Sequence, residues 1–324
     1  VTGTWGADGT AYFWDVTNPS DIKKIDSVQV DARTVNDVKV SQDGKICVIS
    51  REGASNRKNG FVILDISNPS DVKLLSEYTE GLSGGVHNVF IDNNHVYALN
   101  AFGNPAIFDV VNIEDPKNPF RVGVFELNTA GHAIHDVWIE NGIAYSSNWR
   151  DGIVAVDIGG STSNEKESSD IGFNPLLLKA GNGSPSNPVQ LASFPDFKGR
   201  NHSAFPFSSQ STGNFYIVMG DEVFPNGLEN LINNKPSQPR GGFHFINFSD
   251  PENPVEDAAY IVPEAGSHNQ WVYGDILLAG FYQGGIRILD ISGELLGDLY
   301  KQGREICLLY TSPSPRDRTR SRVP

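Results

Sequence analysis

The stretch Phe61-Val62-Ile63-Leu64-Asp65-Ile66 decides the fold, because the same phrase returns along the chain. It consists of an aliphatic strand, an aspartate, a second aliphatic residue and a small polar or glycine turn. Further copies span 12–16, 106–110, 153–158 and 286–291, and a degenerate copy spans 243–248. The marking residues are Asp15, Asp65, Asp109, Asp157, Asn247 and Asp290, at steps of 50, 44, 48, 90 and 43 residues. A fixed period of this kind is typical of a repeat architecture.

Two insertions explain the one long step. Residues 159–187 are rich in Gly, Ser and Asn, and a second insertion spans 224–241. Without them the period returns to about 45 residues.

Each repeat contains four predicted strands. In the third repeat, strands over 87–92 and 95–100 are joined by Asn93-Asn94, which suits the positive backbone angles of a tight hairpin. Strands over 106–110 and 121–127 complete the unit. Proline ends the third strand in four repeats, because it has no backbone donor and restricts the residue before it; the pairs are Asn18-Pro19, Asn68-Pro69, Asp115-Pro116 and Asp250-Pro251. Four strands every 45 residues or so, without an amphipathic helix, predict an all-β protein built as a β-propeller of four-stranded antiparallel blades.

Composition excludes several classes of protein. The formal net charge is −14 and there is no basic stripe, which argues against nucleic acid as a partner. No apolar run is long enough for a membrane span. The two cysteines, Cys47 and Cys307, give no disulfide framework.

Both ends of the chain depart from the repeat. The opening residues, 1–5, match the end of a second strand, so we expect the first strand of that blade to be missing. Residues 305–324 are dominated by Ser, Pro and Arg and resemble translated sequencing-adapter read-through. The sequence therefore predicts a propeller over 1–304 as an incomplete ring, followed by a non-native or disordered tail over 305–324.

The third strands 61–67, 152–158 and 285–292 resemble the repeat of the LVIVD β-propeller family, whose name spells this strand. The resemblance covers roughly 1–304, with Asn247 and the two insertions as departures. It implies a bacterial or archaeal exported or surface protein, often of seven blades and mostly without an assigned activity. About five and a half to six blades are then present, and the ligand is an unknown protein or small molecule. The implied location is extracellular, periplasmic or the cell surface.

Four histidines share one position in the repeat, the start of the first strand. The aligned pairs are Asn36-Asp37, His87-Asn88, His135-Asp136, His202-Ser203 and His268-Asn269. In a propeller this position borders the mouth of the central channel, and the end of the second strand borders the same edge. That second set includes Arg51, Glu52, Asn100, Asn148, Trp149, Asp221 and Glu222, with Tyr282 nearby.

Three interpretations of the histidines stay open. In the first, each histidine bonds a turn of its own blade and recurs because the blade recurs. In the second, His87, His135, His202, His268 and Asp136 hold a divalent or transition metal, since imidazole and carboxylate are the usual ligands. In the third, Asn36, Asp37, Asn100, Asn148, Trp149, Asp221, Glu222 and Tyr282 line a site for a small ligand. We prefer the first.

The sequence shows none of the standard catalytic phrases, neither a nucleophile elbow, a phosphate loop, a zinc-protease motif nor a dinucleotide fingerprint. We expect the insertion over 159–187 to lie away from the histidine edge and that over 224–241 to overhang it. The sequence favours an exported or cell-surface binding scaffold, more often without than with enzymatic activity. The alternative is a metal-dependent enzyme with its site at the mouth of the channel.

Overall fold

The computed structural model describes residues 1–100, 107–128, 133–161, 172–195, 199–223, 240–263 and 265–309. Within these residues the regular structure is β-strand and one short 3-10 helix, η2 (Pro175–Leu178). None of the described segments forms a helix long and apolar enough to cross a membrane. The chain divides into two compact units, Val1–Asn164 with Leu176–Ser193, and Glu165–Pro175 with Phe194–Pro324.

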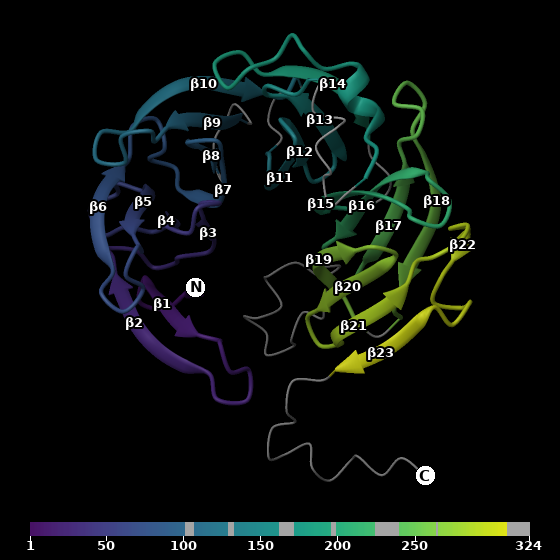
Figure 1. Cartoon of the computed structure of the whole chain (residues 1–324), viewed down its shortest axis with the longest axis horizontal. Coiled ribbons are helices and arrows are strands. Elements are labelled where there is room, and N and C mark those ends of the chain that lie inside the picture. Colours follow the sequence, from purple (N-terminus) through teal and green to yellow (C-terminus); the bar gives the residue numbers. More distant parts are fainter. Residues whose placement is uncertain are drawn as a thin grey trace, which may run out of the picture. The chain divides into compact units, whose positions relative to one another are not determined.

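The first unit contains three four-stranded antiparallel sheets and a two-stranded one (Figure 1). The two-stranded sheet pairs β1 (Thr10–Asp15) with β2 (Lys23–Gln29). The four-stranded sheets follow chain order and consist of β3 (Val38–Val40), β4 (Ile46–Arg51), β5 (Gly60–Asp65) and β6 (Lys73–Tyr78); β7 (Val86–Asp92), β8 (His95–Asn100), β9 (Ile107–Asn112) and β10 (Phe120–Glu126); and β11 (Asp136–Glu140), β12 (Ile143–Ser147), β13 (Ile153–Asp157) and β14 (Val189–Phe194).

The second unit contains two sheets of the same kind. One consists of β15 (Asn201–Ser208), β16 (Phe215–Asp221), β17 (Gly242–Asn247) and β18 (Val255–Ile261), with the two-residue β22 (Gly297–Asp298) added in parallel at its edge. The other consists of β19 (Ser267–Tyr273), β20 (Ile276–Phe281), β21 (Gly285–Asp290) and β23 (Glu305–Leu309). These sheets confirm the predicted four-stranded antiparallel blades.

Turn chemistry explains why the strands end where they do. The residue that closes the third strand accepts the backbone N–H two positions on, which starts a turn and ends the ladder. Asp65, Asn112 and Asp290 do so toward Ser67, Glu114 and Ser292, each at 2.9–3.0 Å. The predicted Asn93-Asn94 hairpin is present, with φ of 41° and 60°.

The third copy of the repeat was aligned wrongly. Asp109 lies in the middle of β9 and is buried, and the turn that ends the strand is made by Asn112. Asn112 pairs with His95, the first residue of β8, as Asp65 pairs with Ile46, the first residue of β4. The marking positions are therefore 15, 65, 112, 157, 247 and 290, and the first steps become 50, 47 and 45. An asparagine serves the turn as well as an aspartate, so Asn112 ends the strand although an aspartate, Asp109, stands three residues before it.

The predicted boundary at residue 304 is also wrong. Glu305–Leu309 forms β23, which pairs antiparallel with β21 as the fourth strand of its sheet. Oε2 of Glu305 accepts hydrogen bonds from Nη1 of the buried Arg287, at 2.6 Å, and from the hydroxyl of Tyr260, at 2.5 Å. The segment Ile306-Cys307-Leu308-Leu309 is apolar, so the Ser, Pro and Arg composition of the residues that follow does not apply to it. The rest of the predicted tail, 310–324, lies outside the described residues.

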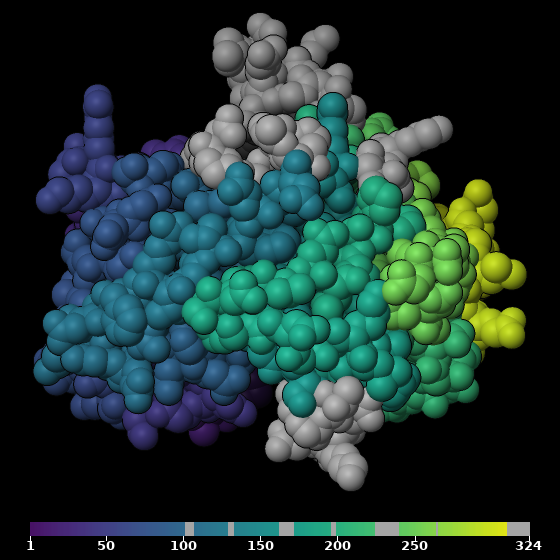
Figure 2. All heavy atoms as spheres, turned by 90° about the horizontal axis from the view of Figure 1, so that it is seen from above, coloured from purple at the N-terminus to yellow at the C-terminus, as the bar shows by residue number. Residues whose placement is uncertain are grey.

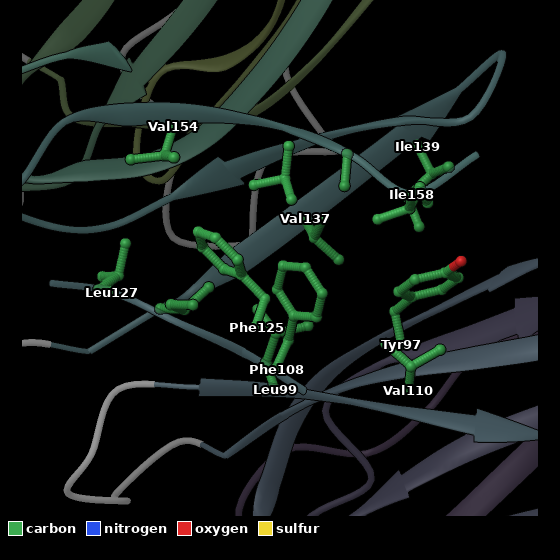
Figure 3. Packing of buried hydrophobic residues seen from close by; sticks show 13 residues of the cluster. Tyr97, Leu99, Phe108, Val110, Phe125, Leu127, Val137, Ile139, Val154 and Ile158 are labelled. Atoms are coloured by element: carbon green, nitrogen blue, oxygen red, sulfur yellow. The ribbon is translucent and has the colours of Figure 1, made fainter. Parts of the chain in front are cut away.

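The cores lie between neighbouring sheets. Figure 3 shows one of them, in which Tyr97, Phe108 and Phe125 of the β7–β10 sheet point toward Val137, Ile139 and Val154 of the β11–β14 sheet. Each such side chain contributes about 1.5–3 kcal/mol through burial.

The first insertion packs against the outside of a neighbouring sheet. A Cβ on Gly123 of β10 would lie 2.2 Å from the carbonyl oxygen of Pro185, so glycine permits the close approach. β10 and the segment before β14 accordingly lie side by side on the face shown in Figure 2. This insertion joins the third strand β13 to the fourth strand β14, and 162–171 within it lie outside the described residues. The second insertion joins β16 to β17, and its residues 224–239 also lie outside them.

Candidate functional site

The register of strand pairing confirms that the four histidines occupy one position. Each lies two residues before the partner of one residue of strand two, in the pairs Val89↔Ala98, Val137↔Ser146, Ala204↔Met219 and Gln270↔Ala279. That residue is the fourth of β8, β12 and β20 and the fifth of β16, which begins one residue earlier. Asn36 holds the same position ahead of Val38↔Ile49. At His87, His202 and His268 the register shifts in a β-bulge. A bulge turns a side chain out of the ladder, so this edge is built to present the imidazoles.

The backbone of the histidines ties neighbouring sheets together. Nδ2 of Asn36 donates to the carbonyl oxygen of His87 at 3.1 Å, and Nδ2 of Asn88 donates to that of His135 at 2.9 Å. The hydroxyl of Ser203 donates to the carbonyl oxygen of His268 at 3.1 Å. The backbone of these histidines therefore helps to hold neighbouring sheets together. These bonds use only the carbonyl oxygens, and the imidazoles contact other groups.

In the first unit the imidazole of His87 bonds a glutamate of the preceding sheet. Its Nδ1 lies 2.6 Å from Oε1 of Glu52, which follows the end of β4 and is nearly buried. The ring of His135 lies 4.9 Å from that of His87 and 4.2 Å from that of Trp149, centroid to centroid. Trp149 has a positive φ of 50°, in the tight turn that follows β12.

Asp136 interacts electrostatically with Lys39 and, more weakly, with His87. Lys39 forms an ion pair with Asp37 at 2.7 Å. Burial raises the pKa of Asp136 to about 6, and Lys39 opposes that rise. Although burial lowers the pKa of Lys39, Asp37 and Asp136 together raise it. Lys39 was not singled out in the sequence; a lysine among predicted buried strand residues was the available signal.

Two of the predicted ligand-binding residues serve their own sheets. Nδ2 of Asn148 donates to the carbonyl oxygens of Ser146 and Gly152, at 3.0 and 3.1 Å, and so closes the β12–β13 hairpin. Oδ1 of Asp221 accepts the N–H of Arg200 at 2.6 Å and fixes the chain ahead of His202. Asn100, at the end of β8, is buried.

In the second unit, His202, Glu222 and His268 converge. Nε2 of His202 lies 3.8 Å from Oε2 of Glu222, and Nε2 of His268 lies 4.0 Å from Oε1. The two imidazole rings are 4.1 Å apart. The hydroxyl of Tyr282 donates to Oε1 of Glu222, and burial followed by this bond raises the pKa of Tyr282.

Glu222 and Glu52 are equivalent residues. The N–H of each donates to a carbonyl oxygen two residues before the opening residue of its own sheet, Arg200 for Glu222 and Thr34 for Glu52, both at 3.0 Å. The sequence predicts Glu222 as a ligand-binding residue on the edge but not as a metal ligand. Its alignment with Glu52, beside a histidine of the following sheet, was the signal that could have identified it.

Comparison with known proteins supports the fold. Residues 55–80 match the family profile of the LVIVD repeat. The chain resembles the β-propeller domain of Cps50 (Swd1) from Myceliophteria thermophila, with a TM-score of 0.57, 10% identity, and coverage of 96% of this chain and 82% of that one. It also resembles Sqt1 of Chaetomium thermophilum bound to the N-terminus of the ribosomal protein L10, with a TM-score of 0.52, 13% identity and coverage of 89% of this chain.

At these identities the resemblance shows the fold alone. The chain spans 66% of the length of that Sqt1 chain. No curated protein sequence matches it.

Proposed function

For this β-propeller, which carries an LVIVD repeat, we propose the function of a binding scaffold whose ligand docks on the histidine edge. We define the histidine edge as the starts of the first strands together with the ends of the second strands. The fold is consistent with an interaction scaffold. It leaves open which surface is used, and that has to be argued from the side chains.

One observation carries the proposal. In both units an imidazole that opens one sheet lies against a glutamate that closes the second strand of the preceding sheet, and an aromatic ring lies close by. The pairs are His87 with Glu52 and His268 with Glu222. Tyr282 contacts His268 directly, whereas Trp149 contacts His135, whose ring lies beside that of His87. Convergent polar groups beside aromatic surface are typical of ligand sites, since the polar groups orient the ligand and the rings supply contact area.

The proposal is tested with peptides selected from a random library on the wild-type chain. We expect Trp149→Ala to weaken the binding of peptides that dock on the first unit, and Tyr282→Ala that of peptides that dock on the second, each at least about tenfold, as hot-spot aromatics do. Phe120→Ala is the matched control, because Phe120 is an exposed aromatic at the start of β10, on the opposite edge. Peptides that bind all three variants as tightly as the wild type would show that the ligand docks elsewhere.

We propose in addition that the protein works outside the cytoplasm, on the cell surface or in an extracellular or periplasmic space. Resemblance to the LVIVD-repeat family supports this location. Fractionation of the source organism with an antibody to this chain tests it, and a purely cytosolic signal would reject it.

A metal-dependent enzyme remains the second candidate, supported by the approach of His202, Glu222 and His268. A thiol mechanism through Cys47 has no support. Cys47 is buried, and burial raises the pKa of its thiol to about 12, so thiolate is scarce at neutral pH.

A further inference from the structure

His202, Glu222 and His268 offer two nitrogen atoms and one carboxylate oxygen to a common point. Their ligand atoms all lie within 4.8 Å of one another. Among the residues that the structure describes, no other set of three His, Cys, Asp or Glu side chains meets in this way. The group comes from two neighbouring sheets, since His202 and Glu222 belong to the β15–β18 sheet and His268 opens β19 (Figure 1).

The distances are close to those of a metal site. Ligand atoms bound tetrahedrally to zinc at about 2.0–2.1 Å are roughly 3.4 Å apart. Nε2 of His202 lies 3.8 Å from Oε2 of Glu222, and Nε2 of His268 lies 4.0 Å from the other oxygen, Oε1. One ligand atom from each residue lies within 4.8 Å of the other two, so closing on one ion requires these separations to shorten by about 0.5–1.4 Å.

The surroundings hold the ligands in place. Ser267 donates from its hydroxyl to the carbonyl oxygens of Asp221 and Gly242, at 2.8 and 2.9 Å, which fixes the start of β19 on the preceding sheet. Tyr282 orients the carboxylate of Glu222 through Oε1, as outer-shell partners of metal ligands do. His202 and Glu222 are buried, whereas the side chain of His268 is 41% exposed, which gives an ion a path from solvent.

We call His202, Glu222 and His268 the triad, and we call the junction between two neighbouring sheets a seam. Three positions of the repeat explain why the triad occurs at the seam between the β15–β18 sheet and the sheet that begins with β19. A triad needs a histidine at the start of the first strand of one sheet, a glutamate at the end of the second strand of that sheet, and a histidine at the start of the first strand of the next sheet. The seam of Glu52 has the second and third, but Asn36 stands in place of the first. In the β11–β14 sheet the position equivalent to Glu52 is occupied by Trp149.

We propose that His202, Glu222 and His268 bind a divalent first-row transition-metal ion, with zinc as the probe. Two imidazoles and one carboxylate suit zinc, cobalt, nickel or iron better than magnesium or calcium, which prefer sets of oxygen ligands. This proposal goes beyond the binding scaffold and does not depend on it.

The test is a zinc titration of chelator-treated full chain by calorimetry, in competition with a chromophoric chelator. The expected result is one zinc per chain, with no comparable binding of Mg²⁺. Glu222→Gln and His268→Ala are each expected to weaken zinc binding at least about 100-fold, the share of one ligand in a site of this kind. Tyr282→Phe keeps all three ligands and should weaken it by roughly tenfold. His95→Ala removes a histidine away from the histidine edge and should change nothing.

Several outcomes would overturn the proposal. A chelator-treated wild type that takes up no zinc rejects it outright. Zinc binding that survives both Glu222→Gln and His268→Ala places the metal elsewhere. Circular dichroism checks that each variant folds; if His268→Ala does not, the near-isosteric Glu222→Gln and the wild-type stoichiometry still decide. A negative zinc titration does not affect the proposed binding scaffold, which the peptide-binding experiment tests separately.

Discussion

Asp109 and Asp157 show how strongly position decides what one side chain does. Oδ1 of Asp157 accepts the N–H groups of Gly159 and Gly160, and Oδ2 accepts three more, from residues 181–183. Burial raises the pKa of Asp157, but these bonds together outweigh burial and lower it. Asp109 lies inside β9 with an ion pair to Nε of Arg121 at 2.5 Å, and burial raises its pKa to about 6 against the pull of Arg121.

The raised pKa of Asp109 makes stability depend on pH. The folded chain holds this proton up to about pH 6, whereas an unfolded aspartate releases it near about 3.9. The resulting stabilisation is complete below the lower value and is lost as pH rises through the higher one. We expect the free energy of unfolding of wild type, relative to Asp109→Asn, to fall by about 2–3 kcal/mol from pH 4 to pH 7.

Urea unfolding of both proteins at the two pH values measures this change. Asp65→Asn is the control, because Asp65 is only half-buried at the end of β5 and the N–H of Ser67, its largest influence, lowers its pKa. A difference between wild type and Asp109→Asn that stays constant with pH would contradict the expectation.

At the scale of strands and turns, much could be predicted because local residues end each strand. The Asx turns and Asx-Pro pairs specify their own geometry from two or three adjacent residues. Two elements were predicted wrongly for the same reason, since both depend on partners far along the chain. The turn at Asn112 is recognised by its pairing with His95, and β23 by its pairing with β21.

The equivalence of Glu52 and Glu222 yields a constructive prediction. Asn36→His supplies the missing member of the triad at the first of these seams, beside Glu52 and His87. We expect zinc stoichiometry to rise from one to two per chain. The change also removes the bonds from Nδ2 of Asn36 to His87 and Asn88, which should lower stability by about 1–2 kcal/mol.

Calorimetry and thermal unfolding measure the two effects separately. The double variant Asn36→His with Glu52→Gln is the control and should return the stoichiometry to one. A stoichiometry that stays at one in the single variant would show that the seam of Glu52 cannot close on an ion.

At the scale of the whole molecule, the repeat predicted the sheets but not the choice among equivalent histidines. The sequence predicts four imidazoles on one edge. It does not distinguish among them as metal ligands, because all four hold the same position in the repeat. What separates them is the side chain that the preceding sheet brings into reach, such as Glu222 for His268. That is a relation between neighbouring sheets, and single-blade alignment does not contain it.

All three proposed ligands belong to the second compact unit. Zinc should therefore slow amide hydrogen exchange in β15, β16 and β19 and leave β3 to β13 unchanged, because an ion stabilises the structure that it holds together. Exchange measured by mass spectrometry with and without zinc tests this. Slower exchange in the β3–β6 sheet instead would assign the ion to the first unit.

The distribution of ligands over neighbouring sheets has an evolutionary consequence. The β15–β18 sheet carries two of the three ligands itself, and any following sheet that opens with a histidine completes the set. It opens with a histidine of its own. A gene duplication that placed two copies of this sheet in tandem would therefore create a further metal site at their junction without a single new residue.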